Sequence, residues 1–137
     1  MTRRLVVDAN RVYSAILKDG ETRRAMMNTG AALFAPRFLR IEIEKHKPDI
    51  VRRSRVPVED VEEALAILHR RIAWVSNDEL APHLVTADAA LGAVDGKGVP
   101  YLACALAVNA DAIWSHDLDF EKQTLVPRVA HPEADLA

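Results

Sequence analysis

The chain has 137 residues, of which half are hydrophobic but only 5% aromatic, with a net charge of −2 and a single cysteine. This length suits one domain over residues 1–137 with a core of its own, and the near-neutral charge excludes a global attraction to nucleic acid or to a membrane surface. No apolar run approaches the ~20 residues of a membrane span, and the N-terminus lacks a signal-peptide pattern, so we expect no membrane partner and a cytoplasmic location.

Predicted strands and helices alternate along the chain. Strands are expected at 5–7, 31–35, 72–76 and 112–115, with an edge strand at 124–126. Helices are expected at 12–18, 22–28, 37–53 with a bend at Pro48, 58–71, 77–91 with caps at Asn77 and Asp78, and 99–108. We expect residues 131–137 to be a disordered tail. The alternation predicts an α/β domain with a central parallel sheet of four or five strands.

The first strand leads directly into a carboxylate. Leu5, Val6 and Val7 form an unbroken apolar run, typical of a strand buried on both faces, and Asp8 follows them. Open α/β sheets bind ligands outside the carboxyl ends of their strands. Asp8 can equally cap the next helix, and Asn10 is as good a cap.

The strand at 112–115 ends in the same way, with His116 and Asp117 just beyond it. If the two strands are neighbours, Asp8 and Asp117 share one crevice, and their like charges require a shared proton or a bound cation. Oxygen ligands of this kind suit Mg²⁺ or Mn²⁺. The competing interpretation is two independent helix caps.

Four segments carry a resemblance to a known family. Residues 5–10 with Ser14 resemble the opening motif of PIN-domain ribonucleases, and residues 36–43 resemble its second motif. Residues 101–107 and 113–120 resemble its last two motifs, in the same order. The resemblance implies a three-layer α/β/α PIN-like fold and a metal-dependent endoribonuclease that cleaves RNA phosphodiester bonds.

The resemblance also assigns roles to individual residues. Four acids match the catalytic positions: Asp8, Glu42, Asp117 and Asp119. Of these, Asp8 and Asp117 are the expected ligands of Mg²⁺ or Mn²⁺, while Asn10 and Ser115 are polar neighbours that orient ligands or water. Small stand-alone members resemble VapC-type toxins, which implies RNA, a cognate antitoxin and a second copy of the chain as partners.

One position departs from the family pattern. Gly98 occupies the place where the family usually has an aspartate before the buried helix. Asp95 supplies the missing carboxylate if the turn at 95–98 folds back, whereas Lys97 would instead bring a cation near the acids. The alternative function is therefore a degenerate PIN module that binds RNA or a partner protein without cleaving. A phosphatase with Asp8 as nucleophile is disfavoured, because its usual Asp-x-Asp opening needs an acid at Asn10.

The remaining polar and reactive residues carry weaker expectations. Glu42 and Glu44 lie two apart on a helix and so face different directions. His116 is expected to be a hydrogen-bonding neighbour of the site, and Cys104 a reduced core residue. A basic stretch either binds RNA phosphates or forms a solvated face, and it contains Lys45, Lys47, Arg52, Arg53 and Arg55.

Overall fold

The computed structural model describes residues 2–17 and 20–135. Its parallel strands form one five-stranded sheet in the order β3-β2-β1-β4-β5. The strands are β1 (Arg4–Val7), β2 (Ala32–Pro36), β3 (Ile72–Val75), β4 (Ala112–Trp114) and β5 (Arg128–Val129). The predicted α/β class and parallel sheet are confirmed.

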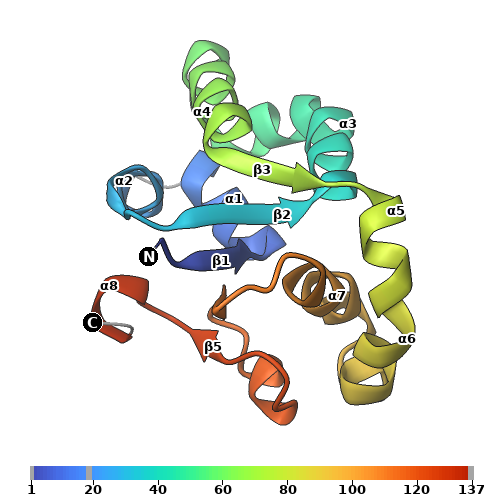
Figure 1. Cartoon of the computed structure of the whole chain (residues 1–137). Helices are drawn as coiled ribbons and strands as arrows, with labels where there is room; N and C mark the ends of the chain where they lie inside the picture. The colour runs from blue at the N-terminus through green and yellow to red at the C-terminus, as the bar shows by residue number, and fades with distance from the viewer. Residues whose placement is uncertain (1, 18–19, 136–137) are drawn as a thin grey trace.

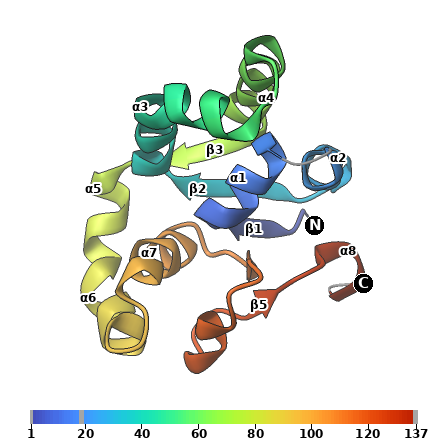
Figure 2. The same ribbon diagram turned by 180° about the vertical axis from the view of Figure 1, so that it is seen from behind.

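Helices cover both faces of this sheet. Helix α7 contacts β1, β2 and β4 on one face, and α1 lies across the other beside α2, α3 and α4 (Figures 1 and 2). These helices are α1 (Ala9–Leu17), α2 (Glu21–Asn28), α3 (Arg37–Ser54), α4 (Val58–Arg71) and α7 (Val99–Ala107). The arrangement confirms the expected three layers. Within the described part of the chain, the helices are too short or too polar to cross a membrane.

The apolar patterns explain which surfaces are buried. Leu5, Val6 and Val7 are fully inaccessible in β1, the central strand of the sheet. Helix α4 buries the stripe Val61, Ala64, Leu65 and Leu68, as its helical spacing predicts. The chain winds outward from β1 to β3 on one side and then crosses to β4 and β5 on the other. The carboxyl ends of β1 and β4 therefore lie at the point where the strand order reverses, which is where such sheets form a binding crevice.

The last strand does not lie where the sequence predicts it. β5 is Arg128–Val129, whereas residues 124–126 form a turn wrapped around the buried Gln123. The Gln123 amide donates to the carbonyls of Phe120 and Val126, both at 2.6 Å, and its Oε1 accepts from the backbone N–H groups of Leu125 and Val126. The expected strand at 124–126 is wrong because this side chain satisfies the backbone groups that a sheet ladder would use.

The predicted helix at 77–91 is divided into short pieces. They are α5 (Asn77–Leu80), the 3-10 turn η1 (Ala81–His83), α6 (Leu84–Ala87) and the π-helical turn η2 (Asp88–Gly92). Pro82 lacks the N–H that would continue a regular helix through this region. The cap is Ser76, which accepts from the backbone N–H of Glu79, and not Asn77 or Asp78.

Other boundaries differ less. Helix α3 continues through Pro48, with Ile43 and Ile50 buried on either side of it. α1 begins at Ala9, three residues before the prediction, and the predicted end of that helix at Lys18 lies outside the described residues. The segment expected to be a disordered tail contains a short helix, α8 (Pro132–Asp135).

Candidate active site

A hydrogen bond from the Ser115 hydroxyl joins the ends of β1 and β4. The register pairs Leu5 with Ala112 and Val7 with Trp114, so Asp8 and Ser115 follow side by side. The buried Ser115 hydroxyl donates to the Asp8 carboxylate and accepts from the backbone N–H of Asp117, at 2.9 Å. The condition that the sequence left open is therefore met: β1 and β4 are neighbours, and their ends are linked directly.

Asp8 also caps a helix. Its Oδ1 accepts from the backbone N–H of Arg11 at 3.0 Å, in the first turn of α1, and the side chain is 6% exposed. Asn10, the alternative cap, is an exposed residue within α1. Burial raises the pKa of Asp8, and the nearby charge of Asp117 raises it further, while the bonds from Ser115 and Arg11 oppose this shift. A buried acid with a raised pKa gains most from a nearby cation.

A second group of acids lies beside Asp8. Carboxylate oxygens of Asp95, Asp117 and Asp119 lie within 4.8 Å of one another, and we call these three residues the acid cluster. Asp8, Asp95 and Asp117 line one crevice of about 180 Å³. Asn10, Lys97, Gly98, Tyr101 and Phe120 line it too, and we call this the acid crevice.

Asp117 and Asp119 belong to a turn at the end of β4. Asp117 precedes the 3-10 turn η4 (Leu118–Lys122), and its Oδ1 accepts from the backbone N–H of Asp119 at 2.9 Å. The cap of this turn is therefore Asp117. Asp119 lies 3.5 Å from the Lys122 ammonium, in a pair exposed enough to be weak.

Glu42 is an exposed residue of α3 and is not among the described residues that line the acid crevice or form the acid cluster. Its charge raises the pKa of both Tyr13 and Tyr101, after the larger effect of burial on each phenol. Glu44, two residues later, instead lies 3.6 Å from His69 on α4. The two glutamates therefore face different directions, and Glu42 is the one on the side of Tyr101.

Tyr101 is a residue of the crevice that the sequence did not single out. It lies on the otherwise apolar helix α7, where its side chain is 6% exposed. The charges of Asp8 and Glu42 both act on its hydroxyl. The signal that would have identified it is a single phenol in the first turn of an uncharged helix, three residues after Gly98.

Comparison with known proteins places the chain in a family. A family model described as PIN domain matches residues 6–128. The chain belongs to the PIN-domain family. No curated protein matches it. The match covers β1 to the start of β5 and so includes Asp8, Glu42 and the whole acid cluster.

The donor set of this PIN domain fits a hard divalent cation. Its donors are carboxylate oxygens, the ligands that Mg²⁺ and Mn²⁺ prefer. Ligands on opposite sides of a Mg²⁺ ion lie about 4.2 Å apart, so oxygens within 4.8 Å of one another can reach one ion after small side-chain shifts. Asp95, Asp117 and Asp119 would hold the ion, with Asp8 beside them in the crevice.

The basic residues on α3 lie outside the acid crevice. Lys47 pairs with Glu62 on α4 at 2.7 Å, and Arg52 pairs with Asp49 at 2.6 Å. Arg53 and Arg55 are exposed at the far end of α3, about 16 Å or more along the helix from Glu42. Lys45 is exposed, and none of these side chains lines the acid crevice as the structure describes it.

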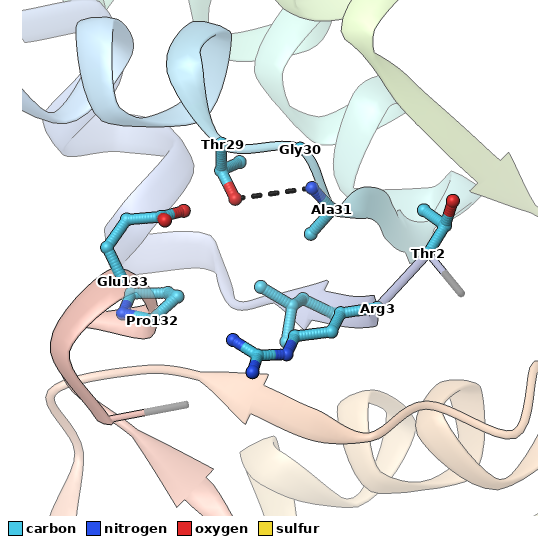
Figure 3. A pocket seen from close by; sticks show the side chains of 8 residues that line it. Thr2, Arg3, Thr29, Gly30, Ala31, Pro132 and Glu133 are labelled. Carbon is cyan, nitrogen blue, oxygen red and sulfur yellow. Dashed lines mark hydrogen bonds between the residues drawn. The ribbon is translucent and has the colours of Figure 1, made fainter. Parts of the chain in front are cut away.

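Two other features lie away from the acid cluster. His116 is exposed, with Nε2 3.3 Å from the carbonyl of Ala130, and it is not among the residues that line the acid crevice in the described chain. A separate cavity of about 390 Å³ lies at the amino ends of the strands (Figure 3). Arg3, Thr29 and Ala31 line it, and Glu133 is the one acid among its described lining residues. With a single acid among its described lining residues, this cavity offers fewer carboxylate ligands than the acid crevice.

Proposed function

We propose that this PIN domain is a metal-dependent endoribonuclease that cleaves RNA phosphodiester bonds with Mg²⁺ or Mn²⁺ as cofactor. The observation that carries the proposal is the acid cluster, gathered beside the buried Asp8 at the switch point of a parallel sheet. Asp117 follows β4 and caps η4, and Asp95 caps the turn before α7, so local hydrogen bonds hold these two side chains in place.

The catalytic residues would be Asp8, Glu42, Asp117 and Asp119. When bound, the ion would activate water and offset negative charge on the phosphodiester. Ser115 holds the Asp8 carboxylate in place by hydrogen bonding, and it also fixes the backbone that presents Asp117. Asn10 lines the crevice from α1, where its amide can orient water or a phosphate oxygen.

The same proposal includes a biological role and the partners of the protein. A small chain of this family is suited to the toxin half of a toxin–antitoxin pair, with a cognate antitoxin and a second copy of the chain as partners. The exposed cations Lys45, Arg53 and Arg55 offer an RNA backbone a place along α3, away from the chemistry.

Metal binding and cleavage test this proposal together. Titration of Mn²⁺ into the protein, followed by calorimetry, should show binding that Asp117→Asn reduces at least about tenfold. A labelled RNA should be cut with Mg²⁺ or Mn²⁺ and left intact with EDTA. Asp60→Asn is the matched control, since Asp60 is an exposed acid in the first turn of α4. Absence of Mn²⁺ binding at millimolar concentration would refute the proposal.

A second candidate is a degenerate PIN module that binds RNA or a partner protein without cleaving. Lys97 lines the acid crevice and Lys122 lies against Asp119, so protein cations are available to offset part of the acidic charge without an ion. Asp8→Asn separates the two functions. If the protein is a nuclease, Asp8→Asn should abolish cleavage. If it is a binding module, the parent protein should cleave no RNA, and Asp8→Asn should keep its affinity for RNA.

A further inference from the structure

The carboxylate of Asp95 is folded back over its own turn. Asp95 immediately precedes the 3-10 turn η3 (Gly96–Gly98), and its Oδ1 accepts from the backbone N–H of Gly98 at 3.2 Å. This bond directs the side chain toward Asp117 and Asp119, with which it forms the acid cluster. An acid four residues ahead of α7 thus reaches the crevice at the start of that helix.

Gly98 has a backbone conformation that does not require glycine. Its φ of −78° and ψ of −17° are right-handed helical values, open to any L-residue. A Cβ at this position would stand 2.7 Å from Asp95 Oδ2, closer than real Cβ contacts come. It would also lie 3.0 Å from Leu91 Cδ2 and 3.1 Å from Phe120 Cε1. The absence of a Cβ at position 98 leaves room for the Asp95 carboxylate.

We infer that Asp95 is a metal ligand of the site and that Gly98 is the residue that makes room for it. The two positions act as one unit, because a side chain at 98 and the Asp95 carboxylate in its present place exclude each other. The inference rests on the proposed function for the presence of an ion, and adds to it which acid completes the site. It also implies that the glycine leaves the metal site intact.

Single substitutions test the two halves of this unit. Asp95→Asn keeps an acceptor for the Gly98 N–H and removes the charge, so the turn should stay folded while Mn²⁺ affinity falls at least about tenfold. Gly98→Ala should lower the affinity by displacing the Asp95 carboxylate. Gly96→Ala is the matched control, because a Cβ there meets nothing within 4 Å in the same turn. It should leave Mn²⁺ affinity within about threefold of the parent.

Relocating the acid is the sharper test. In the double variant Asp95→Ser with Gly98→Asp, serine still caps the turn but leaves the space free, and the new side chain supplies a carboxylate from position 98. We expect Mn²⁺ affinity to return to within about threefold of the parent. Calorimetry and the electron paramagnetic resonance signal of free Mn²⁺ measure this without any RNA, and metal-free thermal unfolding confirms that each variant is folded.

The outcomes separate this inference from the proposed function. If Asp117→Asn loses Mn²⁺ while Asp95→Asn binds it like the parent protein, the role of Asp95 is refuted and the nuclease proposal stands. If the parent protein binds no Mn²⁺, the nuclease proposal itself fails. If Asp95→Asn and Gly98→Ala weaken binding and the relocated acid restores it, the inference is supported.

Discussion

Ser115 offers a direct measure of how strongly the two strand ends are coupled. Ser115→Ala removes the hydroxyl that donates to the buried Asp8 carboxylate and accepts from the Asp117 N–H. A hydrogen bond to a charged group contributes about 1.5–3 kcal/mol, and the lost acceptor of Asp117 adds to the cost. We therefore expect the free energy of unfolding to fall by about 2–3 kcal/mol, measured by urea denaturation at pH 8 without metal.

A matched serine provides the control. The Ser54 hydroxyl donates to the carbonyl of Val51 at 3.3 Å and accepts from the N–H of Val56 at 3.2 Å, so it makes the same number of bonds without a charged partner. Ser54→Ala should cost about 1 kcal/mol or less. Equal costs for the two substitutions would refute the idea that the Asp8 carboxylate gives the Ser115 bond its strength.

The cost of Ser115→Ala should also depend on pH. Because burial raises the pKa of Asp8 above 3.8, this carboxyl takes up a proton before an ordinary aspartate as the pH falls. Once it is neutral, the bond from Ser115 is an ordinary neutral hydrogen bond. The difference in unfolding free energy between parent and variant should therefore shrink from pH 8 toward pH 4. A difference that stays constant over this range would contradict the raised pKa.

Three further predictions concern Asp8, Arg71 and Cys104. Folded-state ionisation of Asp8 costs stability as pH rises through its raised pKa, so the metal-free parent should lose more stability than Asp8→Asn as the pH rises to 8, while Mn²⁺ should no longer raise the Tm of the variant. Arg71 donates to the carbonyls of three residues around the start of β2, so Arg71→Met should cost about 2 kcal/mol in urea denaturation, against nearly nothing for the exposed Arg70→Met. Burial raises the pKa of Cys104 to about 12, so alkylation at pH 8 should be at least about a hundredfold slower in the folded protein than in denaturant.

The sequence predicts the fold well where the signal is local. The run from Leu5 to Val7 and the stripe on α4 depend on periodicity alone, and the structure confirms both. The strand at 124–126 is wrong for the opposite reason. The backbone of that segment is satisfied by the side chain of Gln123, and hydropathy carries no information about such bonds.

The candidate site is predictable in part for the same reason. Asp8 and Asp117 follow apolar strands, and parallel strands end at one edge of a sheet, so the α/β class places both acids at that edge. They meet because β1 and β4 are neighbours, which the sequence left open. The position of Asp95 does not follow from any pattern. It depends on a bond to the Gly98 N–H and on the packing of Leu91 and Phe120 around a missing Cβ. The sequence could therefore offer Asp95 only as one alternative.

The two roles of Asp8, helix cap and crevice acid, were alternatives in the sequence, and the structure shows that they coexist. Capping α1 uses Oδ1 of Asp8 and accepting from Ser115 uses Oδ2, so the two roles together need both oxygens of a carboxyl group. The charge is costly at this position, since burial and Asp117 both disfavour it. An amide has a single acceptor oxygen, so it would keep one of these two bonds and turn its NH2 group toward the other donor. In the proposed metal site a bound cation would offset the charge of Asp8, and Asp8→Asn tests that reasoning through the effect of Mn²⁺ on stability.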